Sequence, residues 1–153
     1  MRPQLFTLVT NAKPARVVVA DDDHSAVELL REAFERSSCS CEIEAVFSGQ
    51  QLLDYLQKVD SDDDKRPSLI LLDLNMPGKD GRQTLTEIKA DPGLRDIPII
   101  IMTSSELEED VERSYQSGVN AYLKKPSVFS DLVRMTSAIK EFWFGCATLP
   151  HHY

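Results

Sequence analysis

The chain has 153 residues, which is enough for one domain with a substantial core and short for two. Its formal net charge of −8 disfavours sequence-independent binding to nucleic acid, which needs a basic face. No apolar run approaches the roughly 20 residues that span a bilayer, and the N-terminus lacks the apolar core of a signal peptide. These features predict a soluble, cytoplasmic protein that binds neither nucleic acid nor membrane.

The first predicted strand is followed at once by a cluster of acids. Residues 1–15 contain two prolines and are expected to form a tail. Residues 16–20 (RVVVA) are a short, β-branched apolar run, which is typical of a strand. The acids Asp21, Asp22 and Asp23 come next, and Asp23 is a candidate N-cap for the helix that follows.

A second strand is predicted near an edge of the sheet, because residues 41–47 alternate polar and apolar side chains. Ser48 and Gln51 then form a capping box for another helix. The acidic loop at residues 60–67 lacks the glycine and the glutamate of a calcium-binding loop, so we interpret it as a solvated loop.

Residues 68–81 (SLILLDLNMPGKDG) contain a strand that ends in an acid. The run LILL is bounded by turn residues, as is typical of a strand buried on both faces in a parallel sheet. It ends at Asp73, and the residues from Asn75 to Gly78 indicate a turn. Asp80 and Gln83 mark the start of the next helix.

The second half of the chain repeats the alternation of strands and helices. Residues 97–102 (IPIIIM) predict a buried strand followed by Thr103. Ser105 and Glu108 are expected to form a capping box for a helix that runs to residue 117. Its few apolar side chains predict a weakly buried helix with one apolar face, made of Leu107, Val111 and Tyr115. A short strand at residues 121–123 precedes Lys125 and a final helix.

This alternation predicts a parallel sheet with helices on both faces. Connections of this kind are right-handed, so the carboxyl ends of all strands lie on one edge. We therefore expect one shallow pocket to contain Asp21, Asp22, Asp73, Thr103 and Lys125. Three crowded carboxylates repel one another unless a cation neutralises them, and Mg²⁺ favours oxygen ligands of this kind. The lysine and the threonine could then donate hydrogen bonds to a phosphoryl group.

Four segments, VVVADDD, LILLDLNMPGKDG, IPIIIMTSS and AYLKKP, resemble in order and spacing the motifs of the receiver domain of two-component response regulators. The resemblance covers roughly residues 16–140. It implies an α/β, flavodoxin-like fold with a doubly wound five-stranded parallel sheet in the order 2-1-3-4-5. The domain is expected at residues 16–144, with a C-terminal tail at 145–153 and no output domain.

The resemblance also implies the role of each site residue. Asp73 would accept a phosphoryl group from a histidine kinase. Asp22, Asp73 and the backbone carbonyl of Asn75 would bind Mg²⁺, and Asp21 would help through a water molecule. Lys125 would pair with the phosphoryl group, and the peptide bond that follows it, to Pro126, is expected to be cis.

The same family suggests how phosphorylation changes the domain. The acyl phosphate would attract the Thr103 hydroxyl, and Tyr122 matches the aromatic residue that swings into the vacated space. The output would be a shift in the face made by the fourth and fifth helices and the last strand. Asn75 and Ser105 stand at positions that tune the rate of hydrolysis.

The ending KEFWFGCATLP and the insertion DSDDDK are similar to the small stand-alone response regulators of bacterial phytochromes. This implies a phytochrome-type histidine kinase as the partner. Phe142, Trp143 and Phe144 cannot all face one side of a helix, so we expect at least one to meet a partner or a second subunit. We predict a homodimer through the last strand and its flanking helices.

Two other functions remain open. A phosphatase of the haloacid dehalogenase type also places an Asp at a strand end, but it needs a second Asp two residues later, where Asn75 stands. A degenerate receiver would bind partners without phosphorylation, and the intact set of five site residues argues against it. We therefore predict a phosphoacceptor with at most slow self-dephosphorylation, and no enzyme.

Overall fold

The structure is a computed structural model that describes residues 14–59 and 65–150. The predicted tail at residues 1–13, most of the acidic loop (60–64) and the last three residues lie outside the described residues. None of the described helices is both long enough and apolar enough to cross a membrane.

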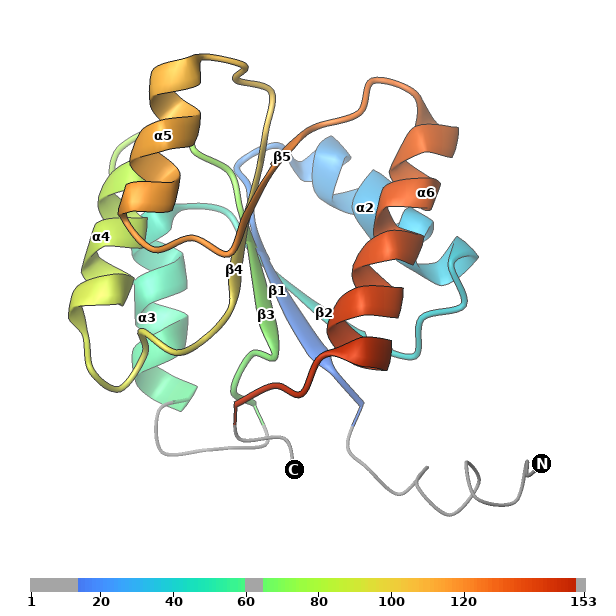
Figure 1. The fold of residues 1–153 in the computed structure, drawn as a ribbon, viewed down its shortest axis with the longest axis horizontal. Helices are drawn as coiled ribbons and strands as arrows, with labels where there is room; N and C mark the ends of the chain where they lie inside the picture. Colours follow the sequence, from blue (N-terminus) through green and yellow to red (C-terminus); the bar gives the residue numbers. More distant parts are fainter. Residues whose placement is uncertain (1–13, 60–64, 151–153) are drawn as a thin grey trace.

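Five parallel strands form a single sheet in the order β2-β1-β3-β4-β5 (Figure 1). Every neighbouring pair is parallel, and β3 lies at the centre. The predicted doubly wound sheet and its strand order are therefore confirmed. The strands are β1 (Arg16–Ala20), β2 (Glu42–Val46), β3 (Leu69–Leu72), β4 (Ile99–Thr103) and β5 (Ala121–Lys124).

Helices cover both faces of the sheet (Figure 1). One face carries α2 (His24–Arg36) and α6 (Phe129–Ile139), and the other carries α3 (Gly49–Val59), α4 (Gly81–Ala90) and α5 (Glu108–Gln116). The chain continues from α6 as a π-helix, η1 (Lys140–Cys146).

The central strand contributes to two separate cores. Ile70 and Leu72 pack with side chains of α3 and α4, whereas Leu69 and Leu71 pack with side chains of α2 and α6. All four are at most 1% exposed. This is why the strand is apolar at every position and does not alternate.

The helix caps just after β1 and β3 were predicted correctly. Asp23 accepts hydrogen bonds from the backbone N–H groups of Ser25 and Ala26 at the start of α2. Asp80 accepts one from the N–H of Gln83 at 3.0 Å at the start of α4. Each cap satisfies N–H groups that have no partner within the helix, and so holds the short segment between the strand and the helix.

Helix α5 begins differently from the prediction. The expected capping box of Ser105 and Glu108 does not form, because Leu107 is the N-cap residue and no side chain caps this described helix. The Ser105 hydroxyl instead donates to Asp110 Oδ2 at 2.6 Å and accepts from the Leu107 N–H at 3.3 Å. The prediction failed because the serine has a partner further along the helix.

Helix α5 is weakly buried, as predicted, and the side chains that it does bury are polar. Its buried residues are Asp110 and Ser114, while Leu107 and Tyr115, expected on an apolar face, are exposed. The carboxylate of Asp110 tolerates burial because Arg82 on α4 pairs with it at 2.9 Å. The ion pair joins residues 28 positions apart, so local periodicity could not indicate it.

The described residues contain no cis peptide bond, so the Lys125–Pro126 bond is trans and the expectation of a cis bond is wrong. The trans form of a bond before proline is the more stable isomer by about 0.5–1 kcal/mol.

Of the three aromatic residues in η1, Phe142 is exposed, and Trp143 and Phe144 pack against the core on the α2 and α6 side.

Replacing Gly81 by alanine should destabilise the domain by about 1–3 kcal/mol. A Cβ at this position would lie 2.1 Å from the carbonyl oxygen of Asp73 and 2.7 Å from Leu74 Cα, and both are backbone atoms that cannot turn aside. Urea unfolding measures the difference. Gly145→Ala is the control, because its Cβ would meet nothing closer than 3.9 Å; equal unfolding midpoints for the two variants would contradict this packing.

Candidate functional site

Three side chains from separate strand ends meet at one edge of the sheet. Asp21 follows β1, Asp73 follows β3 and Lys125 follows β5. Lys125 Nζ lies 2.6 Å from Asp21 Oδ2 and 2.9 Å from Asp73 Oδ2. The two acids are only 5% and 6% exposed. The lysine therefore bridges two buried carboxylates that would otherwise repel each other.

Asp22 adds a third carboxylate to this pocket. Oxygen atoms of Asp21, Asp22 and Asp73 all lie within 4.8 Å of one another, and Asp22 is exposed to solvent. Three carboxylates and one ammonium leave two negative charges, which one divalent cation would cancel. Because all the donors are oxygen atoms, the cluster suits a hard divalent ion that also keeps water ligands.

The protonation of the site follows from its burial and its partners. Burial raises the pKa of Asp21 above its usual value, although the hydrogen bond from Lys125 acts in the opposite direction. Partial burial lowers the pKa of Lys125, but its hydrogen bonds to Asp21 and Asp73 outweigh that effect and leave the pKa raised. The lysine is therefore a charged donor at neutral pH.

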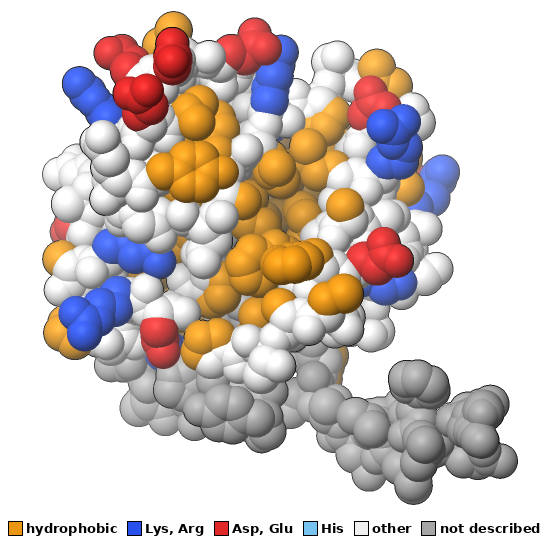
Figure 2. Space-filling model, in the orientation of Figure 1, with side chains coloured by type: hydrophobic (Ala, Val, Ile, Leu, Met, Phe, Trp, Pro, Cys, Tyr) orange, Lys and Arg blue, Asp and Glu red, His pale blue; other side chains and the backbone are white. Residues whose placement is uncertain are grey.

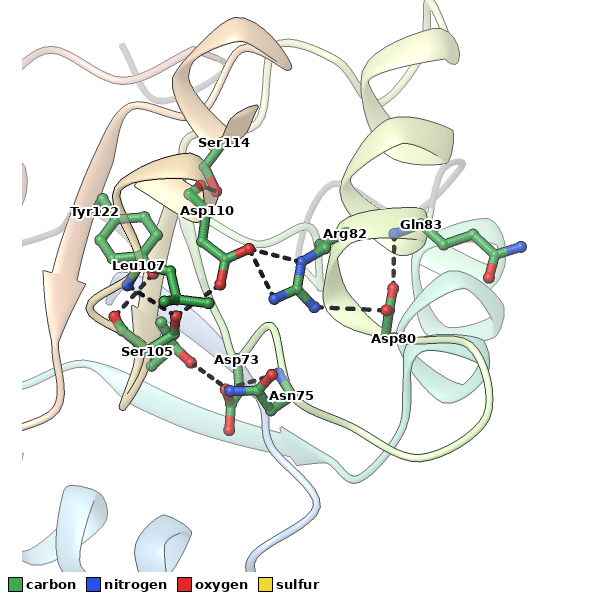
Figure 3. A network of polar contacts seen from close by, with 11 residues as sticks. Asp73, Asn75, Asp80, Arg82, Gln83, Ser105, Leu107, Asp110, Ser114 and Tyr122 are labelled. Carbon is green, nitrogen blue, oxygen red and sulfur yellow. Dashed lines mark hydrogen bonds and ion pairs between the residues drawn. The ribbon is translucent and has the colours of Figure 1, made fainter. Parts of the chain in front are cut away.

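Asn75 connects Asp73 to Thr103. The backbone N–H of Asn75 donates to Asp73 Oδ1 at 3.0 Å, and its side-chain amide donates to Thr103 Oγ1 at 3.3 Å. Figure 3 shows Asn75 lying beside Asp73 at the base of the site. Thr103 is fully buried at the end of β4, and its carbonyl accepts from the N–H of Lys125 at 2.8 Å. The threonine is thus adjacent to the acidic pocket and reaches Asp73 through Asn75.

Ser105 and Tyr122 lie on the α5 side of this pocket (Figure 3). The Tyr122 hydroxyl donates to the Ser105 carbonyl at 3.0 Å, and burial raises the pKa of that hydroxyl. The ring packs against the core on the α3 and α4 side. Tyr122 is therefore attached to the loop that follows Thr103.

Arg82 and Asp110 were not among the residues singled out from the sequence. The Arg82 side chain donates to Asp110 Oδ1 through Nε at 3.1 Å, and its Nη2 forms an ion pair with the same oxygen at 2.9 Å. One weak signal was available: Asp110 and Ser114 are four residues apart and so share a helix face. A helix face formed by polar residues is normally predicted to be exposed, so the burial of this face was not expected.

Comparison with known proteins identifies the family. Residues 17–137 match the response regulator receiver domain. This chain belongs to that family. The chain is 38% identical over 138 residues to Response regulator Rcp1 of Synechocystis sp. PCC 6803. The aligned residues cover 90% of this chain and 94% of Rcp1.

Solved structures agree with this assignment. The crystal structure of the phosphorylated cyanobacterial phytochrome response regulator RcpA superimposes with a TM-score of 0.82 at 37% identity, covering 90% of this chain and 99% of RcpA. The Mn²⁺-bound form of Rcp1 gives a TM-score of 0.80 at 38% identity, with the same coverage. This receiver domain is thus homologous to phytochrome response regulators, and one relative binds a divalent metal.

Adding Mn²⁺ or Mg²⁺ should raise the melting temperature of this protein, because a ligand that binds only the folded state stabilises it by about 2.7 kcal/mol at 100 times its Kd. Asp22→Asn should reduce that metal-induced shift, since it removes one of the three carboxylates while leaving the buried pair intact. Differential scanning fluorimetry across a metal titration provides the measurement.

Asp54→Asn on the outer surface of α3 is the control for loss of an exposed carboxylate elsewhere. The acidic cluster would not be the metal site if Asp22→Asn and Asp54→Asn kept the same metal-induced shift as the unaltered protein.

Proposed function

We propose that this receiver domain accepts a phosphoryl group from a histidine kinase onto Asp73, with Mg²⁺ as the metal. The observation that supports this most directly is the position of Asp73. It is a buried carboxylate at the end of the central strand, with Lys125 at 2.9 Å and two further acids within reach of a shared cation. The similarity to RcpA, which has been crystallised in a phosphorylated form, supports the same role.

The transfer needs little covalent chemistry from the protein. A carboxylate oxygen of Asp73 attacks the phosphorus of a phosphohistidine in line with the P–N bond. The new P–O bond forms as the P–N bond breaks, and the bonding electron pair stays on the imidazole nitrogen. Asp22, Asp73 and the backbone carbonyl of Asn75 would hold Mg²⁺, with Asp21 acting through water. When bound, the ion offsets charge on the phosphoryl oxygens.

Lys125 and Thr103 supply the remaining donors. Lys125 now divides its ammonium between Asp21 and Asp73, and can turn one of its N–H groups to a phosphoryl oxygen. The Thr103 hydroxyl, which now accepts from Asn75, can rotate to donate to the same group. Thr103 is fully buried and Lys125 is partly buried, and donors shielded from solvent stabilise charge more strongly than they would in water.

The response then reaches the face formed by α5, β5 and α6. Movement of Thr103 displaces the loop that carries Ser105, and Tyr122 hydrogen-bonds to that loop. Phosphorylation thereby shifts the population between two arrangements of the face, and hydrolysis of the acyl phosphate reverses the shift. Asn75 and Ser105 tune the rate of that hydrolysis through their positions beside the site.

The phosphoryl donor that we propose is a phytochrome-type histidine kinase in the cytoplasm. Both RcpA and the bacteriophytochrome response regulator AtBRR, which are similar to this chain, are named for such photoreceptors. A turnover phosphatase is less well supported, because Asn75 stands where the second acid of such an enzyme is needed.

Incubation with acetyl phosphate and Mg²⁺ should produce a single phosphate adduct by intact mass spectrometry. The adduct should be absent from Asp73→Asn, since the amide is a far poorer nucleophile than the carboxylate. Asp54→Asn, on the outer surface of α3, should be labelled like the unaltered protein. Labelling of Asp73→Asn, or rapid multiple turnover of small phosphomonoesters, would overturn the proposal.

We also propose that the chain forms a homodimer through the face made by α5, β5 and α6. Figure 2 shows hydrophobic side chains gathered in the middle of this face, with charged side chains around them. Leu107, Tyr115 and Val128 are 60%, 49% and 53% exposed. An apolar centre with a polar rim is the usual composition of a protein interface.

Leu107→Asp should shift the protein from dimer to monomer in light scattering at high concentration. The substitution places a charge on the apolar face but suits the N-cap position of α5, where Asp is favoured, so the helix itself should not weaken. Leu29→Glu on α2 alters a similarly exposed leucine on another face and should leave the dimer intact. A monomeric unaltered protein would disprove the proposed dimer.

A further inference from the structure

Helix α5 is attached to the domain by polar contacts. None of its residues belongs to either apolar core cluster of the described residues. Its two buried side chains are Asp110 and Ser114, and the Ser114 hydroxyl donates to the carbonyl of Asp110 within the helix. Near its C-terminus, the Tyr115 hydroxyl accepts from the N–H of Tyr122 on β5 at 3.1 Å. The position of α5 therefore depends on a few specific hydrogen bonds.

The strongest of these contacts converge on the carboxylate of Asp110. Its Oδ1 accepts from Arg82 Nε at 3.1 Å and forms an ion pair with Arg82 Nη2 at 2.9 Å, and its Oδ2 accepts from Ser105 Oγ at 2.6 Å. Figure 3 shows the carboxylate between the arginine of α4 and the serine of the loop before α5. We call Arg82, Ser105 and Asp110 the polar clamp.

The polar clamp joins the two segments that leave the phosphorylation site. Arg82 is the second residue of α4, which starts where the loop after Asp73 ends. Ser105 is two residues beyond Thr103. The clamp thus spans from the chain that follows Asp73 to the chain that follows Thr103.

We infer that Arg82 and Asp110 are positioning residues that hold Ser105 and α5 in the arrangement described above, so that the polar clamp sets how strongly the domain resists a change in that arrangement. This inference rests on the proposed phosphorylation of Asp73. If Thr103 moves toward a phosphoryl group, Ser105 moves with it. Either its bond to Asp110 breaks or α5 follows the loop.

The cost of breaking the clamp follows from the burial of Asp110. A buried carboxylate that loses a donor is not rehydrated, so the loss costs more than it would at the surface. The clamp therefore adds to the free-energy difference between the two arrangements of the domain. By linkage, weakening the clamp must raise the affinity of the site for any ligand that favours the switched arrangement.

Asp110→Asn should tighten the binding of beryllium fluoride, an analogue of the phosphoryl group, to the Mg²⁺-loaded protein. The substitution keeps the shape of the side chain but removes the charge that Arg82 pairs with. We expect a decrease of about five-fold or more in the apparent Kd by calorimetry, in the range typical of coupling between sites. Hydrogen exchange of the α5 amides should also become faster in the absence of beryllium fluoride.

Asp131→Asn is a closely matched control. Asp131 is the third residue of α6 just as Asp110 is the third residue of α5, and neither helix has a side-chain cap. Asp131 is exposed, and among the described residues its carboxylate forms only a 3.6 Å ion pair, with Arg134 of its own helix. The Asp131→Asn substitution should leave the affinity of the protein for beryllium fluoride unchanged. A general loss of stability in Asp110→Asn would lower its melting temperature without tightening binding, so the two effects are distinguishable.

Ser105→Ala provides a second test should Asp110→Asn fold poorly. It removes the hydroxyl that donates to Asp110 and accepts from the Leu107 N–H, and should tighten binding in the same direction by a smaller factor. An unaltered protein that takes up neither acetyl phosphate nor beryllium fluoride would overturn the proposed function. An unaltered protein that binds, together with clamp variants that bind no more tightly than Asp131→Asn, would overturn the clamp alone.

Discussion

Mutual repulsion among three carboxylates at one edge of the sheet is the constraint on which the site depends. Asp21 and Asp73 are both buried, and their oxygens lie within 4.8 Å of each other and of Asp22. Burial without a partner would protonate at least one of them. Lys125, brought to the same edge by β5, lies 2.6 Å and 2.9 Å from the buried pair and reduces that cost. The remaining negative charge creates the requirement for a cation.

This arrangement makes the site sensitive to any change in its charge. In the proposed mechanism a phosphoryl group brings new negative oxygens to Asp73, and the donors nearby redistribute in response. Lys125 and Thr103 already have other partners, so each new hydrogen bond is made at the expense of an old one. A local change of charge then becomes a rearrangement of the loops that follow β4 and β5.

The helix beyond those loops is suited to move. Helix α5 buries an aspartate and a serine, whereas the neighbouring α4 buries a leucine and an isoleucine. The position of α5 therefore depends more on directional hydrogen bonds and an ion pair than on buried apolar area. Hydrogen bonds and ion pairs are directional, and they can be exchanged between two discrete sets of partners. An apolar contact of the same size would give no such preference for one set of partners over another.

The sequence by itself determined the strands, the order of the elements and the helix caps formed by Asp23 and Asp80. These features depend on the spacing of apolar residues and on capping and turn residues, which are all within a few positions of one another. It also indicated which strand ends carry the site, since parallel strands share one carboxyl edge. Only the tertiary structure decided the buried face of α5, because Arg82 and Asp110 are 28 residues apart and meet only when α4 and α5 pack on the same face of the sheet. The same long-range contact explains why Ser105 bonds to Asp110 and does not cap the helix.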